Sequence, residues 1–170
     1  MALLLLQAYS QCHVPTRFNP GFLQGRIMSL RILLVDDNHT FLTAVSQCLA
    51  MLPEAEVVGH AYTGADALAK AQALQPDLVL LDIVMPHMTG LEVASQMKTW
   101  QHAPLILFLS LHDNDSYRVA ARELGTLGLV GKANFVADLM PIITSLAADQ
   151  LNCQADTLAH ELSNLPEGTP

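Results

Sequence analysis

Apolar runs of strand length alternate with segments of helix length along this chain, and that alternation constrains the fold more than any other feature of the sequence. The helix-length segments cover residues 39–51, 64–74, 89–99, 114–123 and 134–148. The apolar runs are Arg31–Val35, Glu56–His60, Leu78–Asp82, Leu105–Leu109 and Leu127–Val130. Several runs are continuously apolar, which is typical of parallel strands buried on both faces. The pattern predicts an α/β fold: a doubly wound, five-stranded parallel sheet with helices on both faces.

Proline and glycine residues fall at the joints between these segments, where turns are expected. Pro141 is the exception, because it lies inside the last helix-length segment. A proline in a helix interior costs about 3 kcal/mol. We therefore expect the last helix to begin or bend near Asp138, with Pro141 in its first turn.

The size and charge of the chain narrow the classes of function. Its 170 residues, 51% of them hydrophobic, are enough for one globular domain with a full core. The formal net charge of -8 disfavours direct contact with nucleic acid. A membrane span needs about 20 apolar residues, and no such stretch is present. Cys12, Cys48 and Cys153 lack metal-binding or disulfide spacing, so we expect free thiols in a reducing, cytoplasmic compartment.

The two ends of the chain differ in pattern from the middle. Residues 1–27 show no clear periodicity and predict a flexible N-terminal extension, or a start codon placed upstream of a natural start at Met28. Residues 28–148 form the predicted domain, and residues 149–170 an acidic C-terminal tail. Within that tail, residues 150–163 have the spacing of a short amphipathic helix, which would be marginal in isolation.

Polar side chains follow the ends of the predicted strands. Asp36 and Asp37 come after the first run, Asp82 ends the third, Ser110 follows the fourth, and Lys132 follows the fifth. The carboxyl ends of parallel strands form the usual ligand site of such a sheet. Two like charges 4 Å apart repel by roughly 4 kcal/mol at an effective dielectric of 20, so a group of carboxylates implies a bound cation. Oxygen ligands favour Mg²⁺, and the whole set fits a carboxylate that accepts a phosphoryl group.

Each of these residues also has an ordinary structural interpretation. Asp36 with Asn38 could serve to cap the first helix. Ser110 alone is typical of a turn, and Lys132 alone is typical of a solvated surface charge. Their joint placement at one edge of the sheet is what favours a functional site.

The motifs "ILLVDDN", "LLDIVMPHMTG", "LSLHD" and "GLVGKANF" together resemble the response-regulator receiver domain of two-component signalling, in the CheY-like superfamily. The resemblance covers Leu30 to about Ala148 and implies a flavodoxin-like strand order of 2-1-3-4-5. It also implies that Asp82 is the phosphoacceptor and that Asp36 and Asp37 hold Mg²⁺ together with Asp82 and the backbone carbonyl of Val84. Ser110 then matches the switch hydroxyl, and Lys132 the lysine that pairs with the phosphoryl group.

The function that this resemblance implies is transfer of a phosphoryl group from a sensor histidine kinase or phosphotransfer protein, followed by a conformational signal to an unknown output protein. We expect no turnover of other substrates, no direct nucleic-acid contact and no membrane contact. The segment "GLVGKANF" is similar to receivers of LuxR/NarL-type regulators, although the residues after 148 are too few for a DNA-binding domain.

Two other classes of function remain open at this stage. Haloacid-dehalogenase-like phosphohydrolases use a similar nucleophilic aspartate with Mg²⁺, but they need a second aspartate two positions later, where this chain has Val84. A receiver that works as an interaction module without phosphorylation is the other alternative, and the presence of all the site residues disfavours it.

Overall fold

A computed structural model describes residues 29–111 and 114–163. The extension predicted at residues 1–27 and the last residues of the predicted tail, 164–170, lie outside the described residues.

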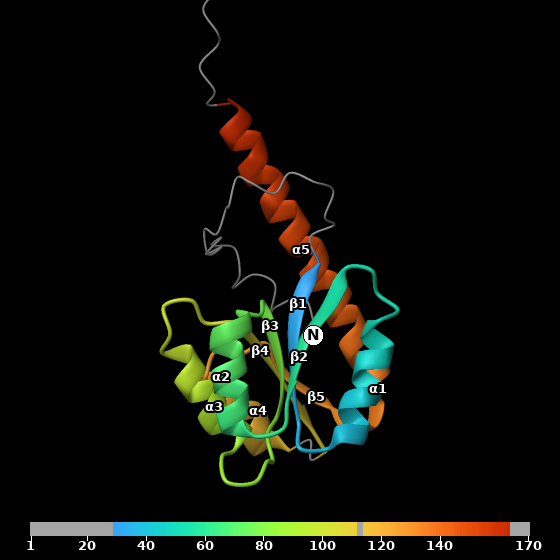
Figure 1. Cartoon of the computed structure of the whole chain (residues 1–170), viewed down its shortest axis with the longest axis vertical. Helices are drawn as coiled ribbons and strands as arrows, with labels where there is room; N and C mark the ends of the chain where they lie inside the picture. Colours follow the sequence, from blue (N-terminus) through green and yellow to red (C-terminus); the bar gives the residue numbers. More distant parts are fainter. Residues whose placement is uncertain (1–28, 112–113, 164–170) are drawn as a thin grey trace, which may run out of the picture.

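Five parallel strands form one sheet in the order β2–β1–β3–β4–β5, as Figure 1 shows. Their bounds are β1 Leu30–Val35, β2 Ala55–Ala61, β3 Leu78–Asp82, β4 Leu105–Ser110 and β5 Gly128–Gly131. Each strand lies within two residues of the apolar run that predicted it. The α/β class, the parallel sheet and the strand order are therefore confirmed.

Helices cover both faces of the sheet, in line with the prediction (Figure 1). Helices α1 (His39–Leu49) and α5 (Phe135–Ser163) lie on one face. The other face carries α2 (Gly64–Leu74), α3 (Gly90–Lys98) and α4 (Asp115–Glu123).

Two apolar cores, one on each face, hold these layers together. Alternate residues of β1 enter opposite cores: Ile32 and Leu34 pack toward α1 and α5, whereas Leu33 and Val35 pack toward α2 and α3. All residues of β3 are buried because this strand lies at the centre of the sheet. This two-sided burial explains why the strands read as continuous apolar runs.

The last helix differs from its prediction. After a short 3-10 helix, η3 (Lys132–Asn134), α5 begins at Phe135 and runs without interruption to Ser163, through Pro141 and beyond the expected end at residue 148. Pro141 and Ala137 are both exposed, so water can satisfy the Ala137 carbonyl, which would otherwise accept a hydrogen bond from residue 141. The helix starts three residues before Asp138 and Pro141 lies beyond its first turn, so that part of the expectation was wrong, while a bend near Asp138 stays a prediction.

Helix α5 is much longer than the others and extends past the sheet (Figure 1). Leu139, Ile143 and Ala147, at intervals of four residues, bury one face of its first half against the sheet. Within the described residues, no helix combines enough length and enough apolar character to cross a membrane.

The turn after β3 is packed against the strand end. The backbone N–H of Gly90 donates to the Ile83 carbonyl at 2.9 Å, and Thr89 caps α3 in a capping box with Glu92. A Cβ atom at residue 90 would lie 2.0 Å from the Asp82 carbonyl oxygen. Only glycine allows the chain to pass this close to the end of β3.

We expect Gly90→Ala to lower the free energy of unfolding by about 2 kcal/mol or more, because the added methyl group collides with backbone atoms that cannot shift independently. Chemical denaturation followed by circular dichroism measures the change. Gly131→Ala is the matched control, since a Cβ there meets no atom within 4 Å. Equal stability of the two variants would contradict the proposed contact.

Candidate functional site

The strand register brings the predicted polar residues to one edge of the sheet. Val35 pairs with Leu81, so the next residue of each chain segment lies side by side: Asp36, just after β1, and Asp82, the last residue of β3. Ser110 pairs with Gly131, the residue before Lys132. The edge that the sequence predicted as the ligand site therefore holds all of these side chains.

Burial separates these residues from ordinary surface groups. In the part of the chain that the structure describes, the buried polar or charged residues are Asp36, Asp82 and Ser110. The Lys132 side chain is 7% exposed, which excludes a solvated surface role for it. Asp37 is exposed at the mouth of the site.

The start of α1 shows which residue caps the helix. The Asn38 side chain accepts a hydrogen bond from the Phe41 backbone N–H at 3.1 Å, and Asn38 is the N-cap. Asp36 Oδ1 instead accepts from the Asn38 backbone N–H at 2.9 Å. Since Asn38 caps the helix, neither Asp36 nor Asp37 is needed for that role.

Lys132 binds two carboxylates at once. Its Nζ atom lies 2.6 Å from Asp36 Oδ2 and 2.9 Å from Asp82 Oδ1. Burial raises the pKa of the Asp82 carboxyl above its ordinary value, and the Asp36 charge acts in the same direction. The hydrogen bond and charge of Lys132, together with a backbone hydrogen bond from Val84, oppose that rise. The environment of Asp82 is therefore costly for its own negative charge and attractive to cations.

The carboxylates have the arrangement of a metal site. One oxygen from each of Asp36, Asp37 and Asp82 lies within 4.8 Å of the others. The cluster has three carboxylates and one ammonium group, which contacts two of them, so it keeps a net negative charge when all are ionised. An all-oxygen donor set of this kind fits a hard divalent cation such as Mg²⁺. The role of the Val84 carbonyl as a further ligand stays a prediction.

An aromatic contact that the sequence did not indicate completes the surroundings of Lys132. Its Nζ atom lies 4.9 Å from the centroid of the Phe41 ring. The Phe41 ring in turn meets the edge of the Phe135 ring, with centroids 5.2 Å apart and planes at 72°. In the sequence, both residues look like ordinary apolar positions of two helices, so no signal there points to this contact.

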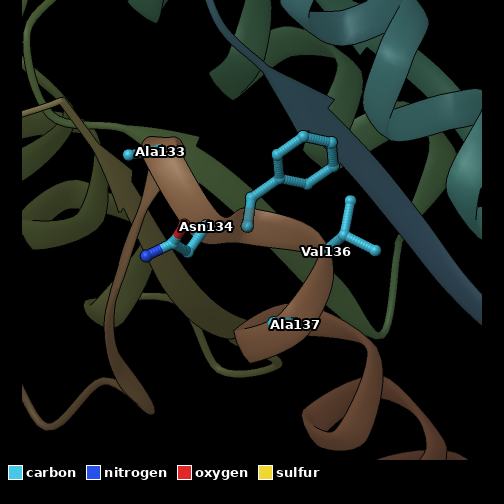
Figure 2. Close-up of a pocket in the computed structure, with 5 residues that line it drawn as sticks. Ala133, Asn134, Val136 and Ala137 are labelled. Carbon is cyan, nitrogen blue, oxygen red and sulfur yellow. The ribbon is translucent and has the colours of Figure 1, made fainter.

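A pocket of about 250 Å³ lies on the segment that follows Lys132, and Figure 2 shows it. Its lining residues are Ala133, Asn134, Phe135, Val136 and Ala137. The Asn134 amide is the one polar side chain among them. The pocket is next to the acidic cluster in sequence but adds no charged group to it.

Comparison with known proteins agrees with this geometry. The sequence model of the response regulator receiver domain family matches residues 32–144 of this chain. The nitrate/nitrite response regulator protein NarL of Escherichia coli (strain K12) is 33% identical over 120 residues, which are 71% of this chain and 56% of that protein. A protein-glutamate methylesterase/protein-glutamine glutaminase of Agrobacterium fabrum is 41% identical over 103 residues, 60% of this chain and 29% of that protein. The chain therefore spans little more than half of NarL, and less of the methylesterase.

Solved structures of receiver domains have the same fold. A LuxR-family two-component response regulator from Aurantimonas sp. SI85-9A1 superimposes with a TM-score of 0.66 at 27% identity, covering 71% of this chain and 86% of that one. The response regulator domain of Thermotoga maritima CheB, at 21% identity, gives a TM-score of 0.64 over 71% of this chain and 97% of that one. With its strand order, its acidic cluster and a family match over most of the described residues, this chain belongs to the response regulator receiver domain family.

Proposed function

We propose that this chain is a phosphorylation-controlled receiver, in which Asp82 accepts a phosphoryl group from a phosphohistidine of a sensor histidine kinase or phosphotransfer protein. The setting of Asp82 is the observation that supports this best. Asp82 is 4% exposed at the end of β3, and its carboxylate lies 2.9 Å from the Lys132 ammonium and is grouped with those of Asp36 and Asp37. A carboxylate so placed can act as a nucleophile with positive charge beside it.

The transfer step uses residues already at the site. A carboxylate oxygen of Asp82 forms a bond to phosphorus while the bond from phosphorus to the donor nitrogen breaks, and that electron pair stays on the donor. Lys132 then stabilises negative charge on the phosphoryl oxygens. Ser110, buried at the end of β4, offers a hydroxyl donor to the same group.

The metal that this proposal includes is Mg²⁺, held by Asp36, Asp37, Asp82 and the Val84 carbonyl. When bound, it neutralises charge on the carboxylates and on the transferred oxygens. The supporting observation is the group of three carboxylate oxygens within 4.8 Å.

The signal passes from this domain to a protein partner through a conformational change. We infer that the chain is related to LuxR/NarL-type regulators, because both NarL and a LuxR-family receiver are among its relatives. Its formal net charge of -8 makes direct nucleic-acid contact by this chain unfavourable. A half-buried free thiol at Cys48 suits the reducing cytoplasm that we propose as its compartment.

We further propose that the chain is not a turnover enzyme and that its chemistry is the gain and loss of its own phosphoryl group. A haloacid-dehalogenase-like phosphohydrolase would need a general acid two residues after Asp82. Val84 stands there, 54% exposed and without a titratable group. The alternative of a phosphorylation-independent module is disfavoured by the buried placement of Asp82, Ser110 and Lys132 together.

We expect acetyl phosphate with Mg²⁺ to add the mass of one phosphate to the protein, because Asp82 ends the central strand β3 with the Lys132 ammonium beside it. Intact mass spectrometry measures it. Asp82→Asn should abolish the added mass. Asp66→Asn, which alters a partly exposed carboxylate paired with Lys70, should keep it. Full labelling of Asp82→Asn would rule out the assignment.

Asp37→Ala should weaken Mg²⁺ binding by at least about tenfold, since it removes one of three charged ligands. Because Asp37 is exposed, the unfolding midpoint should stay nearly unchanged. Calorimetric titration with Mg²⁺ gives the affinity, with Asp66→Asn again as the control. An unchanged affinity would count against the acidic cluster as the metal site.

The phosphoryl group should be lost slowly, over minutes or longer, because Val84 cannot hold or orient a water molecule for hydrolysis. His112, which could hold such a water, lies outside the described residues. Val84→Asn should accelerate the loss by supplying a hydrogen-bonding side chain at this exposed position. The decay of purified phosphoprotein measures both rates, and complete loss within seconds in the wild type would refute the prediction.

A further inference from the structure

The ammonium group of Lys132 is held by three neighbours of different chemistry. Two are the carboxylates of Asp36 and Asp82, at 2.6 and 2.9 Å from Nζ. The third is the face of the Phe41 ring, with its centroid 4.9 Å away. This distance is within the roughly 6 Å of a cation–π contact. Since the Lys132 side chain is 7% exposed, the contact is largely desolvated, the condition under which such contacts are strongest.

The Phe41 ring is itself fixed in place. Phe41 lies on α1 and Phe135 at the start of α5, and the two rings meet edge to face. Both pack against the apolar core between these helices and the sheet. Phe135 comes three residues after Lys132, so the same short segment supplies the ammonium group and the ring that supports Phe41. The position of the Phe41 ring beside Lys132 is therefore set by its contacts with Phe135 and the apolar core.

Lys132 contacts two of the three carboxylates that could hold a metal ion. Asp36 is paired with the ammonium group and is one of the three carboxylates that could hold a cation. Two cations close to the same carboxylates repel each other, so they bind less well together than either does alone. Whatever holds Nζ close to Asp36 and Asp82 therefore affects both the metal and the phosphoacceptor.

We propose that Phe41 is a positioning residue for Lys132, and that it sets the balance between Mg²⁺ binding and phosphoryl stabilisation at Asp82. This inference rests on the proposed phosphoacceptor function. The ring keeps the ammonium group beside Asp36 and Asp82, where it is ready to meet a phosphoryl group. The same contact makes it harder for Nζ to withdraw when a divalent cation enters.

Phe41→Leu tests the proposal, because leucine keeps an apolar side chain but removes the aromatic face. We expect Mg²⁺, titrated alone and followed by amide chemical shifts, to bind about three- to tenfold more tightly than to the wild type. Labelling by acetyl phosphate at saturating Mg²⁺ should slow by a similar factor. Phe41→Tyr retains the ring and should restore both values to near those of the wild type.

A spectroscopic signature separates positioning from packing. The Cε protons of Lys132 should be shifted upfield by the ring in the wild type and in Phe41→Tyr, and should lose that shift in Phe41→Leu. Ile142→Val trims the same core from α5 and serves as the control for packing alone. It should leave the Lys132 shift and the Mg²⁺ affinity unchanged.

The outcomes are distinguishable from a failure of the proposed function. If Phe41→Leu weakens Mg²⁺ binding together with labelling, or if Phe41→Tyr behaves like Phe41→Leu, the ring acts through packing and the inference is wrong. Unchanged Mg²⁺ affinity and unchanged Lys132 shifts in Phe41→Leu also overturn it. If the wild type is not labelled at Asp82, the phosphoacceptor function fails, while the affinity and chemical-shift measurements still decide the role of Phe41.

Discussion

The double ion pair of Lys132 is the interaction on which the rest of this site depends. One ammonium group lies 2.6 Å from Asp36 and 2.9 Å from Asp82, and all three side chains are almost fully removed from solvent. Removing one partner of a buried pair typically costs about 3–5 kcal/mol, because the other charge is left without compensation. With Asp37 nearby, the negative charge still exceeds the positive, so the arrangement holds together and yet attracts a further cation.

The sheet makes this arrangement possible by fixing the ends of its strands. β1 and β3 are neighbours in register, which places Asp36 next to Asp82. Lys132 directly follows the edge strand β5, and its long side chain reaches past the end of β4 to Asp82 and Asp36. Gly90 lets the loop after β3 pass close to the Asp82 backbone. The apolar cores on both faces therefore do more than stabilise the fold, since they hold in position the backbone from which the charged groups project.

Local pattern was sufficient to predict much of this architecture. Strands buried on both faces form continuous apolar runs in the sequence, so β1, β3 and β4 could be located from residue type alone. Two parallel strands of one sheet need a crossover connection between them, which accounts for the helix-length segments between the runs. The last helix could not be located in this way. A rule about proline in helix interiors placed the start or a bend of this helix near Asp138, but the helix starts at Phe135 and Pro141 is exposed, where water can reach the Ala137 carbonyl. Which face of a helix is exposed depends on the elements that pack against it, so the residues around Pro141 do not predict its exposure.

The sequence by itself determined which residues could do chemistry: aspartates after the first and third strands, a serine after the fourth and a lysine after the fifth. It could do so because strand ends in a parallel sheet meet at one edge whatever the details of packing. The tertiary structure alone decided how these residues divide their contacts. Asn38 rather than Asp36 caps α1, Lys132 bridges two carboxylates rather than one, and Phe41 lies beneath the ammonium group. These choices depend on distances between segments far apart in the chain, and residue type and spacing do not encode such distances.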